Sequence, residues 1–170
     1  MSVQVGPASE LGVSARQVQE FYRQNWNRRI ALEDDLFYRW QFTEVPGADD
    51  KDHCSVAVNE RGDVVGVMGL NPRPFLLKGA QRNAAELTTW IVHPDYQSRG
   101  VGPQIMADLQ RRFDVLLGLG ITKSALAVYL RSGFRYLRAI PRFVYVLDWA
   151  VIAPYAKIDP LARKVDTKRR

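Results

Sequence analysis

The residues best suited to chemistry lie in one short segment, residues 97–102, with the sequence QSRGVG. An apolar run that ends at Val92 precedes it, and a helical pattern follows it. A loop between a strand and a helix brings free backbone N–H groups and the positive end of the helix dipole to one place. Glycine lets that backbone approach a ligand closely. The segment therefore predicts a site for a phosphate or diphosphate group.

The spacing within this loop excludes the two common nucleotide-binding signatures. It lacks the G-x-x-x-x-G-K-[ST] spacing of a P-loop. It also lacks G-x-G-x-x-G followed by an acidic residue placed for a ribose. The pattern present is Q-x-x-G-x-G after a strand that ends in V-x-P, and a second pattern, Y-x-x-x-G-F, occupies residues 129–134.

Together the two patterns resemble the GNAT acetyltransferase superfamily, whose loop [QR]-x-x-G-x-[GA] holds the pyrophosphate of acetyl-CoA. The resemblance covers residues 84–138 well and the N-terminal half loosely. It implies an N-acetyltransferase that moves an acetyl group from acetyl-CoA to a primary amine by direct attack in a ternary complex. The acceptor would be an amino sugar or another small amine. The alternative is a non-catalytic GNAT-like domain that binds coenzyme or a partner within a larger protein.

The resemblance also implies roles for residues at matching positions. Strand backbone before the loop would pair with the pantetheine arm, and the N–H of Ile91 would polarise the thioester carbonyl. Tyr129 would protonate the departing thiolate, and Glu86 would deprotonate the amine directly or through a water. The coenzyme-binding residues implied in this way are Trp90, Ile91, Val92, Gln97, Ser98, Arg99, Gly100, Val101 and Gly102.

Plainer interpretations of the two catalytic candidates stay open. Tyr129 lies on an apolar helix face and could belong to the core, and Glu86 could be a solvated carboxylate at a strand edge. The two-residue period of a strand would place Glu86 on one face with Trp90 and Val92. Pro103 departs from the family pattern, because it removes one N–H that could reach the phosphates.

The elements that must position these residues mix helices and strands. The second helix is expected to face the core with Leu36, Phe37 and Trp40. The order of these helices and strands along the chain predicts an α+β or mixed α/β fold. The fold would be GNAT-like, with a central, mostly antiparallel, twisted sheet and helices on both faces. The patterns predict helices over residues 15–26, 33–42, 103–113 and 123–131, and strands over 2–5, 53–58, 64–70, 75–78, 85–92, 114–117, 134–137 and 142–147.

Composition agrees with a single globular domain. The chain has 170 residues, of which 46% are hydrophobic and 25% are charged, close to the average for such domains. We expect residues 1–150 to form the acetyltransferase domain and residues 151–170 a basic tail or linker stub. Residues 157–170 hold six basic and two acidic side chains, so much of the net charge of +6 lies there. This distribution does not favour a nucleic-acid partner.

Several classes of protein are excluded at this point. No apolar run approaches 18 residues, so no transmembrane helix is expected, and no signal peptide is visible. The expected location is the cytoplasm. The single cysteine, Cys54, excludes an intrachain disulfide and a thiolate metal cluster, and we expect it to be a buried apolar side chain. No metal is expected, the expected partner is a small-molecule amine, and a homodimer is left open.

Overall fold

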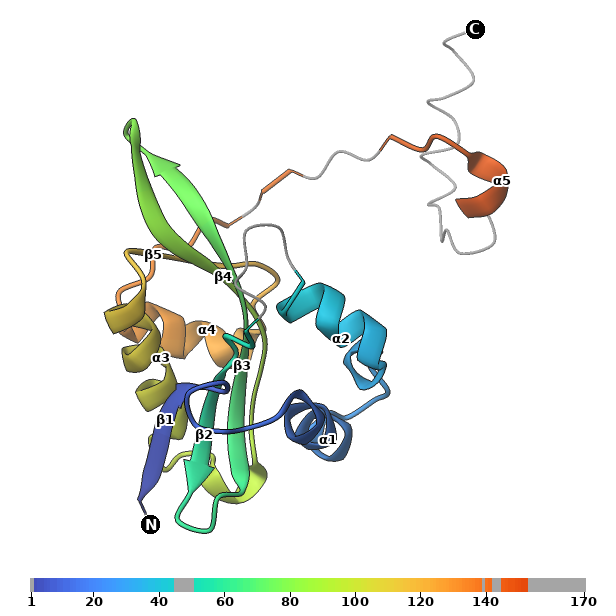
Figure 1. The fold of residues 1–170 in the computed structure, drawn as a ribbon. Helices are drawn as coiled ribbons and strands as arrows, with labels where there is room; N and C mark the ends of the chain where they lie inside the picture. Colours follow the sequence, from blue (N-terminus) through green and yellow to red (C-terminus); the bar gives the residue numbers. More distant parts are fainter. Residues whose placement is uncertain (1, 45–50, 139, 142–144, 153–170) are drawn as a thin grey trace, which may run out of the picture. The chain divides into compact units, whose positions relative to one another are not determined.

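A computed structural model describes residues 2–44, 51–138, 140–141 and 145–152. Five strands form one sheet in the order β1-β2-β3-β4-β5. Neighbouring strands are antiparallel, except that β4 and β5 are parallel (Figure 1). This confirms the predicted mostly antiparallel sheet. The strands are β1 (Val3–Pro7), β2 (Ser55–Asn59), β3 (Val64–Leu77), β4 (Ala80–Val92) and β5 (Val115–Gly118).

The chain divides into two compact units, residues 1–135 and residues 136–170. The sheet and its helices belong to the first unit, and residues 153–170, most of the expected tail, lie outside the described residues. The helices are α1 (Ala15–Asn25), η1 (Ala31–Glu33), α2 (Asp35–Phe42), η2 (Pro94–Tyr96), α3 (Val101–Arg112), α4 (Lys123–Arg131) and, in the second unit, α5 (Trp149–Ile152).

Polar caps start two of these helices where the sequence predicts them. The Ser14 hydroxyl accepts from the backbone N–H of Gln17, and the Gln17 side chain accepts from the backbone N–H of Ser14. Thr122 caps α4 by accepting from the backbone N–H of Ala125. Each cap satisfies N–H groups that have no partner within the helix.

Helices cover both faces of the sheet, which confirms the predicted layers (Figure 1). On one face α1 and α2 bury Tyr22, Tyr38 and Phe42. On the other face α3 buries Ile105 and Leu109, and α4 adds Tyr129 to the same apolar cluster. Helices α1 and α2, before β2 in the chain, and helices α3 and α4, after β4, therefore pack on one central sheet.

The prediction that α2 faces the core with Leu36, Phe37 and Trp40 is wrong. These three side chains are exposed, while Tyr38 and Phe42 are fully buried. Residues four apart lie on one side of a helix, so Tyr38 and Phe42 form an equally regular apolar stripe. Because α2 is apolar on two sides, its sequence pattern alone could not select the buried one.

The two strands predicted over residues 64–70 and 75–78 are one continuous strand, β3, with Pro72 and Pro74 inside it. Proline is tolerated in a strand where its missing N–H faces an open edge. Within the described residues β2 pairs with β3 only as far as Met68, so the edge beside both prolines is open.

Two further boundaries differ from the predictions. Helix α3 begins at Val101, so Pro103 is its third residue rather than its first. The N–H groups of the first turn have no partner within a helix, so proline costs little at either position. The predicted strand over 134–137 is absent, since these residues have no regular structure, and part of the strand predicted over 142–147 lies outside the described residues.

Candidate active site

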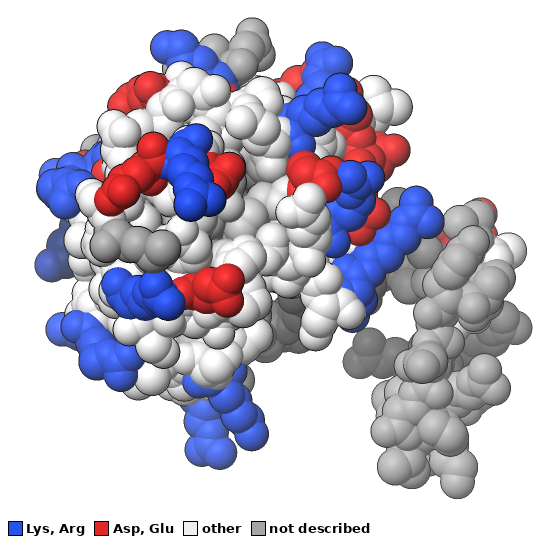
Figure 2. Space-filling model, turned by 90° about the horizontal axis from the view of Figure 1, so that it is seen from below, with Lys and Arg blue, Asp and Glu red and all other residues white. Residues whose placement is uncertain are grey.

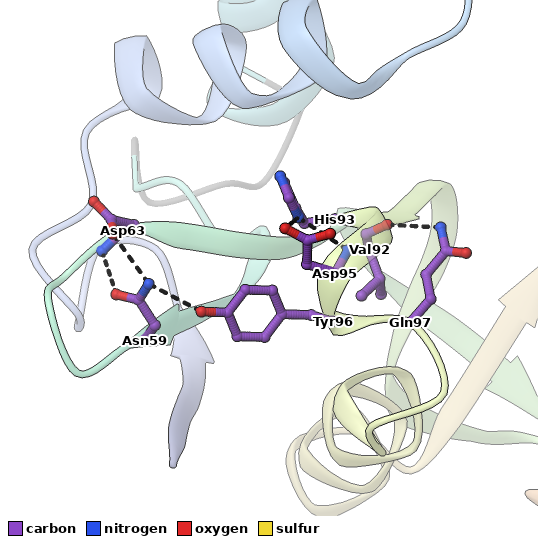
Figure 3. Close-up of polar contacts among 7 residues, drawn as sticks. All are labelled: Asn59, Asp63, Val92, His93, Asp95, Tyr96 and Gln97. Carbon is purple, nitrogen blue, oxygen red and sulfur yellow. Dashed lines mark hydrogen bonds and ion pairs between the residues drawn. The ribbon is translucent and has the colours of Figure 1, made fainter. Parts of the chain in front are cut away.

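The loop between β4 and α3 is fixed by side chains at both of its ends. The Gln97 side-chain amide donates to the carbonyl oxygen of Val92 at 3.0 Å, which ties the loop to the end of β4 (Figure 3). Asn59 donates to the Tyr96 hydroxyl at 3.2 Å and to Asp63 at 3.0 Å. The loop is thereby also tied to the turn between β2 and β3.

Gly100 sets the direction in which this loop enters α3. It is the N-cap of α3 and has a φ of 83°, in the left-handed region that favours glycine. Ser98 also has a positive φ, 60°. The backbone N–H groups of the first turn of α3 therefore open onto the loop, which is the arrangement that binds phosphate groups.

Gly102 has a different neighbour from the one that its place in the pattern suggests. A Cβ atom on Gly102 would lie 2.9 Å from Cζ2 of Trp90, which is too close for carbon atoms that are not bonded. The indole ring therefore packs directly on the backbone of α3. Sequence reasoning gave the ligand as the reason for glycine here, whereas the structure shows that Trp90 already requires it.

Strands β4 and β5 diverge before β4 reaches this loop. They pair only between residues 84–87 and 115–118, and β4 then continues to Val92 without β5 beside it. The main-chain edge of residues 88–92 is therefore not covered by β5. An extended ligand could pair with this edge as an added strand does, with its diphosphate on the loop.

A bulge in β4 lies at this divergence. Gly69 pairs with Thr88 and Val67 pairs with Ile91, so β4 has one residue more than β3 between the two pairs. Thr89, inside the bulge, has a φ of 42°. Such an extra residue reverses the phase of the strand, so side chains before and after it change faces.

This phase reversal makes one sequence expectation wrong. Trp90 and Val92 pack in the apolar cluster under α3, together with Leu87. Glu86 is adjacent to Leu87, and its side chain lies on the α2 side of the sheet. Glu86 therefore does not share a face with Trp90 and Val92, as a regular two-residue period would require.

Tyr129 lies where β4 and β5 diverge. Its ring centroid is 5.6 Å from that of Trp90 and 4.9 Å from that of Phe134, and both contacts are edge-to-face. A Cβ atom on Gly118, the last residue of β5, would be 3.0 Å from the Tyr129 ring. Burial raises the pKa of Tyr129 to about 12, so its hydroxyl is protonated at neutral pH. A protonated hydroxyl is what a general acid requires.

Glu86 is a partly exposed carboxylate on the α2 side of the sheet. Its Oε2 lies 3.2 Å from Nη2 of Arg73 on β3. The residue opposite it on β3, Asn71, is buried and, with its amide suitably oriented, hydrogen-bonds to Gln41 of α2. The structure therefore brings Trp90, Gly102 and Tyr129 together but places Glu86 in the other layer.

Sequence reasoning missed a buried hydroxyl that supports the bulge. The Tyr22 hydroxyl on α1 donates to the carbonyl oxygen of Thr89 at 2.9 Å and lies 3.0 Å from the Thr89 hydroxyl. The available signal was a tyrosine rather than a phenylalanine at a core position, because a buried hydroxyl needs a partner. Tyr22 is thus a candidate for holding the main chain of β4 in place.

Charge is spread over the surface near the loop. Seen from the loop end of the sheet, Lys and Arg side chains alternate with Asp and Glu, and no large area carries one sign (Figure 2). Within the described residues no cluster of three His, Cys, Asp or Glu side chains could hold a metal ion. None of the helices in the described residues is long and apolar enough to span a membrane.

Comparison with known sequences decides the family of the chain. The family model described as "Acetyltransferase (GNAT) family" matches residues 15–134, which include the whole sheet except β1. The chain belongs to this family. Its class of activity is therefore acyl-CoA-dependent acetyl transfer. Among curated proteins no match was found.

Solved structures of GNAT acetyltransferases share the fold at low sequence identity. An aminoglycoside antibiotic 6′-N-acetyltransferase from Acinetobacter baumannii is 14% identical with a TM-score of 0.59, over 86% of this chain and 100% of that one. An aminoglycoside N-acetyltransferase in complex with CoA is 16% identical with a TM-score of 0.59, over 85% and 95%. Glucosamine-6-phosphate N-acetyltransferase from Arabidopsis thaliana is 13% identical with a TM-score of 0.57, over 87% and 100%.

Proposed function

We propose that this GNAT acetyltransferase transfers an acetyl group from acetyl-CoA to a primary amine by direct attack in a ternary complex. The observation that carries the proposal is the uncovered edge of β4 over residues 88–92, with the Gln97–Gly102 loop at one end and Tyr129 at the other. The diphosphate would lie on the loop N–H groups. The pantetheine arm would run along β4, and its thioester would lie beside Tyr129.

The direction of the backbone N–H groups supports a choice of donor to the thioester carbonyl. The N–H of His93 donates to the carbonyl of Val65 on β3 at 2.9 Å. Residues in an antiparallel pair alternate between bonding the partner strand and pointing away from it. By this alternation the N–H of Ile91 points to β3 and that of Val92 points to the opening, and we propose that the N–H of Trp90, at the end of the bulge, points to the opening as well. The proposal therefore uses the N–H of Trp90, which is next to Tyr129, rather than that of Ile91.

The reaction is a balanced transfer without an enzyme-bound acetyl group. The amine nitrogen forms a bond to the thioester carbon, the carbonyl oxygen becomes an oxyanion held by the Trp90 N–H, and the C–S bond then breaks. Tyr129 gives its proton to the departing thiolate. The amine loses a proton to Glu86 through a water, because the sheet separates this carboxylate from the thioester; the alternative is loss to bulk water before binding.

An amino sugar is the acceptor class that we propose. Three similar structures are named for acetyl transfer to aminoglycosides or to glucosamine 6-phosphate, which are amino sugars. Arg73 and Glu86 supply polar groups on the α2 side, which could bind hydroxyl groups and an ammonium group. The acceptor would then approach from the α2 side while the coenzyme enters from the β5 side.

Release of free thiol from acetyl-CoA, measured against a panel of amines, tests the proposal. The panel contains glucosamine, glucosamine 6-phosphate, an aminoglycoside, a polyamine and a lysine peptide. We expect thiol release that depends on an amine, with the amino sugars preferred. Binding of acetyl-CoA by calorimetry without turnover of any amine would instead support the non-catalytic alternative, which the separation of Glu86 from Tyr129 favours.

A further inference from the structure

Helix α2 carries an exposed apolar surface outside the proposed site. Leu36 is 75% exposed, Phe37 37% and Trp40 61%, and the rings of Phe37 and Trp40 pack with centroids 5.3 Å apart. We call these three residues the α2 stripe. The opposite side of α2 holds Tyr38 and Phe42, which are buried. The stripe therefore faces away from the sheet of its own chain.

The hairpin of β3 and β4 provides a second exposed apolar surface. Residues 72–83, which we call the arm, extend past the other strands of the sheet (Figure 1). Leu76 is 72% exposed and Leu77 is 42% exposed. A two-stranded ribbon is only marginally stable in water, so a partner that covers the arm would stabilise it. Exposed apolar surfaces of this kind mark interaction sites.

The edges of the arm are not free to pair with another strand. Pro72 and Pro74 remove N–H groups from the open edge of β3, which is a device that prevents strand addition. On the β4 edge the backbone N–H of Asn83 donates to Asp114 at 3.2 Å, and its side chain donates to the carbonyl of Arg112 at 2.9 Å. The arm therefore offers side chains rather than backbone to a partner.

The two surfaces carry opposite charge. The arm contains three basic side chains and no acidic one, and one of the three, Arg73, is paired with Glu86. Residues 31–44 contain four acidic side chains, of which Glu33 and Glu44 are paired with Arg29 and Arg39, while Asp34 and Asp35 form no ion pair within the described residues. Lys78 and Arg82 form no ion pair within the described part of the chain, and Asp35 is exposed at the start of α2. Complementary charge of this kind favours a specific partner and orients it.

We propose that the arm of one copy packs on the α2 stripe of a second copy. The proposed contact is reciprocal, with the arm of each copy on the stripe of the other, so that a two-fold axis relates the copies and closes the assembly as a homodimer. Leu77 would cover Phe37 and Trp40, while Lys78 and Arg82 would lie near Asp34 and Asp35. This inference is independent of the acceptor and of the chemistry proposed above.

Disulfide cross-linking between copies tests which surfaces meet. The native Cys54 is fully buried, so introduced cysteines are the accessible ones. Full-length Leu77→Cys and Trp40→Cys proteins, one carrying a mass tag, are mixed and oxidised. We expect the mixed disulfide, and we expect none when Arg16→Cys on exposed α1 replaces Trp40→Cys. A disulfide that joins two Leu77→Cys chains in preference to the mixed one would overturn the proposal.

Sedimentation of the full chain tests the assembly and the role of charge. We expect the wild-type chain to form a dimer, and we expect Arg82→Glu to raise its dissociation constant at least about tenfold. Adding Asp35→Arg to Arg82→Glu should restore the wild-type dissociation constant. The control Arg61→Glu should leave it unchanged. The proposal would be overturned by any of three results: a monomer at every concentration, a dimer whose dissociation constant does not change in Arg82→Glu, or an assembly of more than two copies. Capture of an acidic protein of another kind by a monomeric chain would do the same.

Discussion

The hydroxyl of Tyr129 makes no hydrogen bond within the described residues, although its ring is enclosed by Trp90, Phe134 and the end of β5. If the hydroxyl serves as the acid, Tyr129→Phe should lower kcat by about 10²–10⁴-fold. Acetyl-CoA affinity and the free energy of unfolding should change little, because the ring stays. Phe134→Leu, which disturbs packing and keeps the hydroxyl, is the control. A wild-type rate in Tyr129→Phe, with chemistry rate-limiting, would assign Tyr129 to the core.

The hydroxyl of Tyr22 acts at a distance from any substrate, by holding the Thr89 carbonyl in the bulge. Tyr22→Phe leaves that buried carbonyl with one partner fewer and should cost about 1–3 kcal/mol of stability. It should also lower kcat, because the neighbouring Trp90 N–H moves. Tyr38→Phe is a matched control, since it removes a buried hydroxyl bonded to Asp52 at 2.6 Å on the same layer. Equal kcat values in the two variants would show that Tyr22 is structural only.

The loop and the helix that follows it depend on the left-handed conformation of Gly100. Gly100→Ala should cost about 1–2 kcal/mol of stability, because a Cβ atom disfavours that conformation. It should also weaken acetyl-CoA binding, as the first turn of α3 is displaced. Gly12→Ala is the control: Gly12 also has a positive φ, 67°, with open space around it. Calorimetry with both folded variants checks the difference. If both bind acetyl-CoA as tightly as wild type, the loop does not hold the diphosphate.

How far the sequence could predict these elements depends on which interactions fix them. Local caps at Ser14 and Thr122, and the loop pattern, act over a few residues, so the sequence reveals them. The bulge at Thr89 arises from pairing between two strands, and no local pattern marks it. It alone moves Glu86 to the other face. The burial of Tyr38 rather than Trp40 likewise depends on tertiary packing, because both sides of α2 are apolar.

Across the whole molecule, the buried tyrosine hydroxyl groups and the buried cysteine thiol should make the free energy of unfolding fall at alkaline pH. Burial raises the pKa values of Tyr22, Tyr38, Tyr129 and Cys54, so the folded state keeps protons that the unfolded state loses above about pH 8.5 for cysteine and about 10 for tyrosine. The stability that these groups contribute is fully present below those values, and it is lost progressively as the pH rises from them through the higher folded-state pKa values. Each group can contribute up to about 1.4 kcal/mol per pH unit.

Denaturant unfolding between pH 7 and 11 measures this loss. We expect the free energy of unfolding to fall progressively above about pH 9, and to fall less steeply above pH 10 in Tyr129→Phe, which lacks one titrating group. Tyr38→Phe should reduce the slope by a similar amount, because up to pH 11 both hydroxyl groups stay protonated in the folded chain and ionise in the unfolded one. A flat profile up to pH 11, or identical slopes in all three proteins, would mean that these hydroxyl groups ionise as readily in the folded chain as in the unfolded one.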